Sequence, residues 1–296
     1  MPELPEVETV VRELRALLRG REIVRASLTA PDLYRRGSRR VGVLAGVRID
    51  DVRRRGKAIV VAGTRVGGAR GGADTLVVHL GMTGRLEWEE RGPGGRTGGR
   101  RGRAAERAAH LHARWAFRDG SELRYFDPRR FGFVFVGAPA EVDATLRIGP
   151  DPFEMTAAGL SRALSGRHAS VKALLLDQRI VSGLGNIYVD ESLHLARVHP
   201  LTPGDRASRR AGDILAAARR VLTRAIAARG TTLRDYRRPD GATGEFQSML
   251  VVYGREGEAC SRCGARIARI EIAGRGTHFC PRCQRAPRVS ATWRRR

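Results

Sequence analysis

Hydrophobic residues near the start of the chain recur three and four positions apart, which is the spacing of one face of a helix. The series runs through Leu4, Val7, Val10, Val11, Leu14, Leu17 and Leu18. Gly20 comes soon after the last of them and is a typical stop signal. The pattern therefore predicts an amphipathic helix at the N-terminus.

From residue 23 to residue 136 the pattern changes to short runs of Val, Ile and aromatic residues separated by turn residues. The clearest runs cover 57–61, 75–80, 123–126 and 131–136. Such runs are typical of strands in an antiparallel sandwich or barrel. Two stretches rich in Gly and Arg, 63–73 and 91–107, interrupt them and are predicted to be solvated loops.

The second half of the chain returns to helical spacing. Segment 137–152 contains Pro139, Pro150 and Pro152 and predicts a linker. Predicted helices follow at 156–164, 168–178, 186–196 and 206–229. We therefore expect an α+β multidomain protein. Its expected parts are a sheet domain at 1–136, the linker at 137–152, a helical domain at 153–250, a cysteine-containing segment at 251–284 and a basic tail at 285–296.

The net charge of the chain indicates the class of partner that it binds. Lys and Arg number 55 against 31 Asp and Glu, so the formal net charge of +24 favours a polyanionic partner. No apolar run approaches the roughly 18 residues of a membrane span, and the acidic first residues do not resemble a signal peptide. We expect a cytoplasmic protein that binds no membrane. Lys57 and Lys172 are its only lysines. Lysine is a compact cation that can release a proton and arginine is not, so these two positions are candidates for a role that Arg cannot fill.

Four cysteines form two Cys-x-x-Cys pairs. Cys260 and Cys263 are followed, after sixteen residues, by Cys280 and Cys283. This is the spacing of a zinc ribbon, and four thiolates leave no open coordination position on the metal. The sequence therefore predicts one structural Zn²⁺. A second, weaker signal is the stretch from Gly183 to Asn186 before a predicted helix, where backbone amides could approach a phosphate.

The N-terminus can carry chemistry of its own. Once Met1 is removed, Pro2 presents a secondary amine, and α-amino groups have a pKa near 8, so part of it is neutral at pH 7. Such an amine can attack a sugar C1′ to give an iminium ion. Glu3 and Glu6 are near enough in sequence for acid and base roles. A Pro and acidic residues are also ordinary features of a helix start, and the N-terminus by itself favours that interpretation.

The order of the motifs along the chain decides between these interpretations. From residue 2 to about 284 the chain resembles the bacterial formamidopyrimidine-DNA glycosylases. The matching motifs are Met1 to Glu8, Arg55 to Lys57, His79 to Gly84, Asp127 to Gly132, Asp177 to Ser192, Gly230 to Leu233 and the cysteine pairs. The insertion at 91–107 and the tail after 284 depart from the family without touching a motif.

The resemblance implies a fold and a set of catalytic residues. The fold is an N-terminal two-layered β-sandwich with a flanking helix, followed after a hinge by a helix-two-turns-helix domain and a zinc finger. Pro2 matches the nucleophile, Glu3 the acid that assists base loss and ring opening, Glu6 a supporting carboxylate, and Lys57 a catalytic lysine near the lesion.

The resemblance also implies DNA contacts. Met82, Arg129 and Phe131 match the residues that fill the space left by the flipped nucleotide, with Arg129 facing the orphan base. The remaining matches are His110 as a DNA contact, Lys172 and Asn186 as phosphate contacts, and Arg275 as a phosphate contact that also serves the catalytic site.

The resemblance implies a bifunctional enzyme that is both a glycosylase and an abasic-site lyase, and we expect it to be a monomer. It would remove 8-oxoguanine and formamidopyrimidines from duplex DNA and cut the strand by β,δ-elimination. Two alternatives remain at this point. A relative of the endonuclease VIII type would prefer oxidised pyrimidines, although 237–246 resembles the loop that covers the lesion in the purine enzymes. A zinc-ribbon DNA-binding protein without catalysis would not depend on Pro2.

Overall fold

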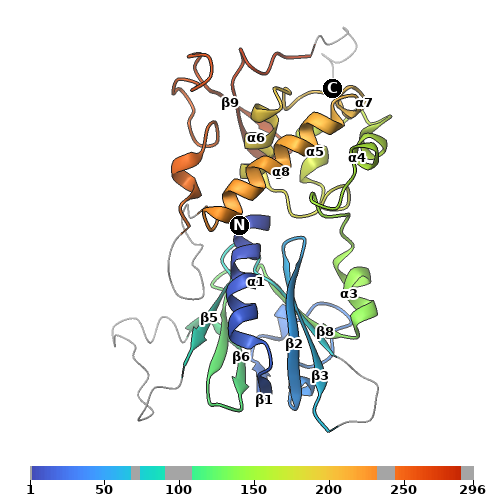
Figure 1. Cartoon of the computed structure of the whole chain (residues 1–296), viewed down its shortest axis with the longest axis vertical. Helices are drawn as coiled ribbons and strands as arrows, with labels where there is room; N and C mark the ends of the chain where they lie inside the picture. The colour runs from blue at the N-terminus through green and yellow to red at the C-terminus, as the bar shows by residue number, and fades with distance from the viewer. Residues whose placement is uncertain (1, 68–73, 91–108, 232–243, 288–296) are drawn as a thin grey trace. The chain divides into compact units, whose positions relative to one another are not determined.

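A computed structural model describes residues 2–67, 74–90, 109–231 and 244–287. The insertion at 91–107, most of the stretch 237–246 and the end of the basic tail lie outside these residues. The chain forms two compact units (Figure 1). The first comprises Met1–Arg147 and Ala228–Gln247, and the second comprises Ile148–Ala227 and Ser248–Arg296.

The N-terminal helix has the predicted position. Helix α1 covers Leu4–Leu18, and six of its seven periodic hydrophobic residues are buried. It lies along strand β2 (Val47–Arg55) in Figure 1 and packs against it. After α1 the chain turns through Gly20, which adopts a φ of 82° that a glycine tolerates without strain.

An antiparallel sheet of eight strands forms the framework of the first unit. Its spatial order is β5-β7-β6-β1-β2-β3-β4-β8. The other strands are β1 (Glu22–Leu28), β3 (Ala58–Arg65), β4 (Thr75–His79), β5 (Arg85–Glu89), β6 (Leu111–Phe117), β7 (Glu122–Phe126) and β8 (Phe133–Gly137). Short 3-10 turns, η1 (Pro31–Leu33) and η2 (Val41–Leu44), follow β1. Leu86 and Val134 come from the two edge strands and yet share one core cluster, so the sheet folds over itself into two layers.

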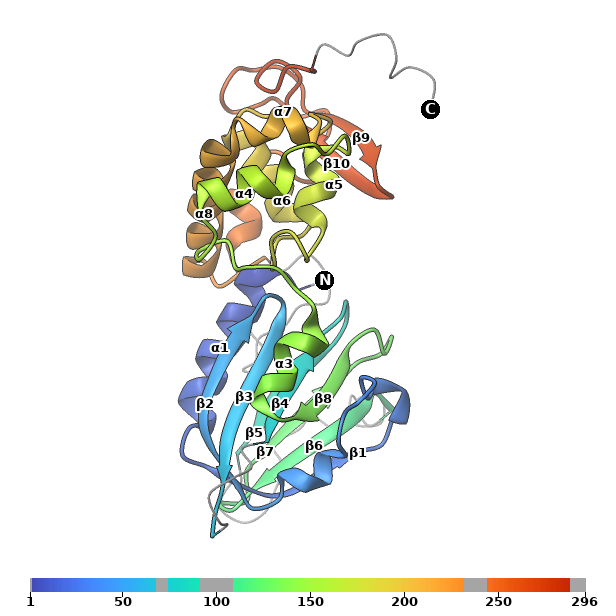
Figure 2. The same ribbon diagram turned by 90° about the vertical axis from the view of Figure 1, so that its right-hand side faces the viewer.

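The predicted linker contains a helix. Helix α3 (Pro139–Leu146) lies over the sheet in Figure 2. Pro139 occupies the first turn, where a proline is favourable, and the Glu141 carboxylate accepts the Ala138 N–H at 2.6 Å. Val142 is buried against the sheet beside Val77. The proline that predicted irregular chain is thus a helix-start residue.

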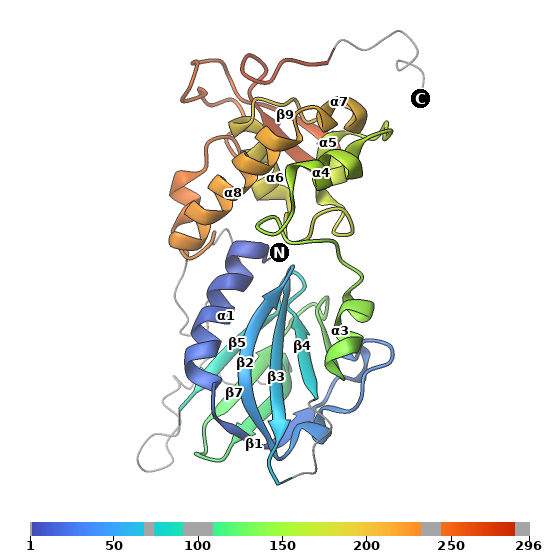
Figure 3. The ribbon, with the colours of Figure 1, turned by 45° about the vertical axis from the view of Figure 1, so that its right-hand side comes forward.

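Helices dominate the second unit. They are α4 (Ala157–Leu164), α5 (Val171–Leu176), α6 (Asn186–Leu195), α7 (Gly204–Ser208) and α8 (Ala211–Ala227). Helix α8 packs against α4 and α6 (Figure 3). The single helix predicted at 206–229 is wrong: it is two helices, because the amides of Gly204 and Asp205 bond to the chain before α5 and fix the direction of α7. Helix α5 begins later than predicted because Ser170 caps its start, accepting from the Ala173 N–H.

The cysteine-containing segment has a β-hairpin between its two cysteine pairs. Strands β9 (Ala268–Ile272) and β10 (Arg275–Phe279) pair antiparallel. The two residues between them, Ala273 and Gly274, have φ values of 50° and 68°, the pattern of a type I′ turn. Arg275 therefore stands directly after a tight turn. A further 3-10 turn, η4 (Phe246–Met249), precedes this segment, and no helix in the described part of the chain is long and apolar enough to cross a membrane.

Candidate active site and DNA contacts

The start of α1 is tied to a distant part of the chain. Pro2, Glu3 and Glu6 are all buried. One oxygen of Glu6 accepts the Glu3 N–H at 2.8 Å, and the other accepts the Thr231 N–H at 2.7 Å. Gly230 has a φ of 82°, and a Cβ there would come within 2.9 Å of Glu6. Glu6 therefore fixes the residues around Pro2, and its carboxylate is already engaged in hydrogen bonds.

Lys57 lies beside a histidine that the sequence analysis left without a role. It is buried at the turn between β2 and β3, and the neighbouring Ala58 pairs with His79 of β4. Burial lowers the pKa of His79 to about 4, with further lowering by the positive charges of Lys57 and Arg35. His79 is therefore neutral at pH 7, and its Nδ1 accepts the Gly81 N–H at 3.1 Å. The signal for it in the sequence is its position at the head of the His79 to Gly84 motif.

The residues expected to fill the gap in DNA stand at the surface. Met82 and Phe131 are 38% and 53% exposed, so neither side chain is packed in the core. The Arg129 guanidinium lies 4.4 Å from the centre of the Phe131 ring. Met82 lies between β4 and β5, and Arg129 and Phe131 lie between β7 and β8. The structure thus leaves all three side chains available to a ligand.

Lys172 has a different position from the one expected for a phosphate contact. Its side chain is 0% exposed, and its Nζ donates to Asp190 Oδ1 at 2.6 Å and to the Gly276 carbonyl at 3.3 Å. The expectation of a direct phosphate contact is corrected, because reaching solvent would leave the buried Asp190 carboxylate without its cation. Lys172 instead joins α5, α6 and the hairpin.

The other expected DNA contacts differ in accessibility. Asn186 begins α6 and is half-buried; its Nδ2 donates to the Gly276 carbonyl at 3.0 Å, while its buried Oδ1 has no partner among the described residues. Arg275 is exposed beside the hairpin turn. His110 is half-buried just before β6, and its backbone carbonyl accepts the Asp127 N–H at 3.1 Å.

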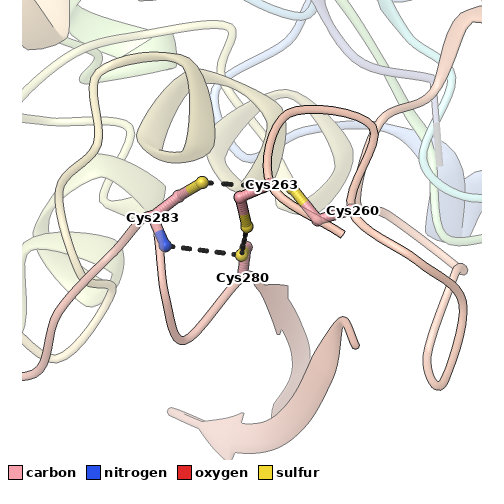
Figure 4. Close-up of side chains that lie close together, drawn as sticks. All are labelled: Cys260, Cys263, Cys280 and Cys283. Atoms are coloured by element: carbon pink, nitrogen blue, oxygen red, sulfur yellow. Dashed lines mark hydrogen bonds between the residues drawn. The ribbon is translucent and has the colours of Figure 1, made fainter. Parts of the chain in front are cut away.

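The four cysteines form a compact cluster (Figure 4). Their Sγ atoms all lie within 4.8 Å of one another, with Cys263 and Cys280 at 3.4 Å and Cys260 and Cys283 at 4.0 Å. Sulfurs bound to one tetrahedral zinc at about 2.3 Å would be separated by about 3.8 Å, so the cluster fits the metal. The pKa of the Cys263 thiol is lowered to about 7, chiefly because the Ala265 backbone N–H points at it. The cysteines thus form a site for one structural zinc.

Helix α6 holds this segment in place from one side. Glu191 accepts the backbone N–H groups of Val251, Val252 and Tyr253 at 2.9 to 3.1 Å. Asp190 accepts the His278 N–H at 2.8 Å. These bonds run from backbone N–H groups to buried carboxylates, and such charge-assisted bonds are among the stronger hydrogen bonds in proteins. The helix that begins at Asn186 therefore also positions the hairpin that carries Arg275.

Comparison with known proteins agrees with this arrangement. Residues 1–134 match the formamidopyrimidine-DNA glycosylase N-terminal domain, 148–237 match the H2TH domain of the same enzymes, and 257–286 match a zinc finger found in FPG and IleRS. The chain belongs to the formamidopyrimidine-DNA glycosylase family.

Individual relatives cover nearly all of the chain. The formamidopyrimidine-DNA glycosylase of Phenylobacterium zucineum is 42% identical over 294 residues, which are 96% of this chain and 100% of the relative. The crystal structure of the MutM (Fpg) protein of Thermus thermophilus has a TM-score of 0.78 at 40% identity and covers 96% of this chain and 98% of its own. A point mutant of the Lactococcus lactis Fpg, solved in complex with DNA containing Fapy-dG, has a TM-score of 0.80 at 34% identity, covering 96% and 100%.

Proposed function

We propose that this chain is a base-excision DNA glycosylase that removes oxidised purines from duplex DNA and then cuts the strand at the abasic site. The observation that carries the proposal is the buried start of α1, where Pro2 and Glu3 are fixed by the bond from Thr231 to Glu6. Solved relatives are complexes with DNA containing Fapy-dG, an abasic site or carbocyclic 8-oxo-G, which supports oxidised purines as the substrate class.

Pro2 would act as the nucleophile. With Met1 removed, its neutral nitrogen attacks C1′ of the damaged nucleotide, the bond from C1′ to the base breaks, and the base leaves with a proton. Glu3 would donate a proton to the ring oxygen, so that the sugar opens to an iminium ion. Loss of a C2′ proton then expels the 3′ phosphate by β-elimination, and loss of a C4′ proton expels the 5′ phosphate by δ-elimination. Water finally releases Pro2 from the sugar fragment.

The neighbouring residues would support this chemistry. Glu6 positions the nucleophile, because both of its oxygens already accept backbone N–H groups. Lys57 supplies a compact positive charge beside neutral His79, which favours the phosphates of a nucleotide drawn into the site.

The exposed loop residues would fill the space that the extruded nucleotide leaves in the duplex. A base inside a duplex hides its C1′, so the nucleotide must be extruded at a cost of a few kcal/mol. Met82 and Phe131 are suited to fill the gap as apolar wedges. Arg129 can donate to O2 and N3 of an orphan cytosine, whereas adenine presents an amino donor, so we expect a preference for lesions opposite cytosine.

Phosphate contacts would come from the second unit. Asn186 and Arg275 stand at a helix start and beside a hairpin turn, and the net charge of +24 adds sequence-independent attraction to DNA. Zinc, when bound to the four cysteines, supplies structure and no chemical step. The protein would work where the chromosome is, in the cytoplasm.

The proposal is tested with duplexes that carry a single lesion. Single-turnover excision should be fast for 8-oxoguanine and formamidopyrimidine and slow for an oxidised pyrimidine such as thymine glycol. Faster excision of the pyrimidine would favour an enzyme of the endonuclease VIII type. Binding without excision of any lesion would favour a DNA-binding protein without catalysis.

A further inference from the structure

Two surface loops of the first unit meet at one buried carboxylate. Asp127 is 0% exposed and lies at the end of β7. Its Oδ1 accepts the Thr83 hydroxyl at 2.6 Å, and its Oδ2 accepts the Gly132 N–H at 2.8 Å and the Tyr125 hydroxyl at 3.1 Å. Thr83 belongs to the loop between β4 and β5, whereas Gly132 belongs to the loop between β7 and β8. A single side chain therefore accepts from both loops.

The Thr83 hydroxyl makes a second bond across the same junction. Its oxygen accepts the backbone N–H of Arg129 at 3.3 Å while its proton is donated to Asp127. A hydroxyl can act as donor and acceptor together, so Thr83 links the buried carboxylate to the backbone of Arg129. The residue before Thr83 is Met82, so this link joins two of the three residues expected in the DNA gap.

The backbones of the two loops also touch. Gly81 has a φ of 60°, and a Cβ there would lie 2.4 Å from the Phe131 carbonyl carbon. A Cβ on Gly132 would lie 2.0 Å from the Tyr125 hydroxyl oxygen. Both positions therefore require glycine. Contacts this close leave the loops little freedom to shift separately. Within the joined pair, the Thr83 hydroxyl holds the backbone N–H of Arg129.

We infer that Thr83 is a positioning residue that sets Arg129 relative to Met82 and thereby controls discrimination of the base opposite the lesion. The inference rests on the proposed function. An arginine distinguishes cytosine from adenine only if its donors are held within a few tenths of an ångström and roughly 10 to 20° of the base edge. Losing the hydroxyl leaves the Arg129 amide and one Asp127 oxygen without this shared partner, so Arg129 samples more positions.

The test compares variants with and without the hydroxyl. Thr83→Val keeps the shape of the side chain and removes both hydrogen bonds of the hydroxyl. Thr83→Ala also removes both bonds, and its smaller side chain cannot cause a steric clash. Thr83→Ser keeps the hydroxyl. Single-turnover excision of 8-oxoguanine is measured opposite cytosine and opposite adenine, at a temperature where circular dichroism shows every variant folded.

The expected result separates the variants by their hydroxyl. Thr83→Val and Thr83→Ala should reduce the cytosine-to-adenine rate ratio about tenfold, the order expected for a hydrogen bond to a charged group. Thr83→Ser should keep the ratio within about twofold of the unmodified chain. A mere loss of stability would lower both rates together and leave their ratio unchanged.

Two results would overturn the inference. One is an unchanged ratio in Thr83→Val and Thr83→Ala, whatever the absolute rates. The other is a Thr83→Ser variant that loses the ratio as Thr83→Val does, since the methyl group and not the hydroxyl would then matter. Absence of excision by the unmodified chain would contradict the proposed function instead, which distinguishes the two failures.

Discussion

The backbone N–H of Thr231 donates to Glu6 at 2.7 Å, although the two residues lie 225 positions apart in the sequence. The bond is buried, and a charged acceptor makes it stronger than a bond between neutral groups. It brings Thr231, which follows α8 in the sequence, to the first turn of α1, directly after Pro2. The environment of the proposed nucleophile therefore depends on a segment that is remote in sequence.

Glu6→Gln tests this dependence. A carboxamide has one accepting oxygen, so it can serve either Glu3 or Thr231 as acceptor and must turn a donor toward the other N–H. We expect single-turnover excision to fall by at least about tenfold, measured with 8-oxoguanine duplex. Glu8→Gln is the matched control, because Glu8 lies on the same helix and pairs with Arg12 and Arg54. Equal losses in the two variants would contradict a specific role for Glu6.

Lys57→Arg tests the need for a compact cation. The charge is kept, but the planar guanidinium must fit into a buried position next to His79. We expect excision to fall more than DNA affinity does, measured by single-turnover rates and by binding to an abasic analogue. Arg55→Lys, at a neighbouring position paired with Asp143, should change neither by more than about twofold. Unchanged excision in Lys57→Arg would show that lysine is not required.

The salt dependence of DNA binding distinguishes Arg275 from Lys172. Each phosphate contact that is lost lowers the slope of log affinity against log salt by about 0.9. Arg275→Ala should show this change without loss of thermal stability. Lys172→Met should instead destabilise the protein by about 3 to 5 kcal/mol, because it leaves the buried Asp190 carboxylate without the lysine that balances its charge. A lower salt slope and unchanged stability in Lys172→Met would restore the phosphate contact that the structure argues against.

Cys280→Ala tests the structural metal. Three thiolates hold zinc more weakly than four, so the variant should release the metal to a chelator that leaves the unmodified chain loaded. We expect loss of DNA binding. The near-ultraviolet circular-dichroism signal of the tryptophans packed in the core of the first unit, Trp88 and Trp115, should be retained. Metal analysis that finds no zinc in active, unmodified protein would contradict the assignment.

The sequence predicted the elements whose signals are local. The periodicity of α1, the short runs that became β3, β4, β7 and β8, and the spacing of the four cysteines are each contained within a short stretch of chain. Helix α3 was missed because a proline such as Pro139 suits the first turn of a helix as well as a linker. The break between α7 and α8 was missed because bonds to the chain before α5 fix it, and no periodicity reports such bonds.

The candidate site divides in the same way. The residue types at Pro2, Met82, Arg129 and Phe131 could be matched to a family pattern. The burial of Lys172 could not, because it depends on Asp190, a partner on another helix. The junction of Thr83, Asp127 and Arg129 likewise arises only when two loops meet, although each residue lies inside a motif that the sequence had already marked.

The central claim is that the nitrogen of Pro2 forms the covalent bond to the sugar. Borohydride reduction during incubation with an 8-oxoguanine duplex, followed by mass analysis of the peptides, tests it most directly. We predict that a reduced sugar adduct maps to the peptide that begins at Pro2. Chains that retain Met1 should give none, because their Pro2 nitrogen is an amide. An adduct on Lys57, or excision with no adduct at all, would contradict the account.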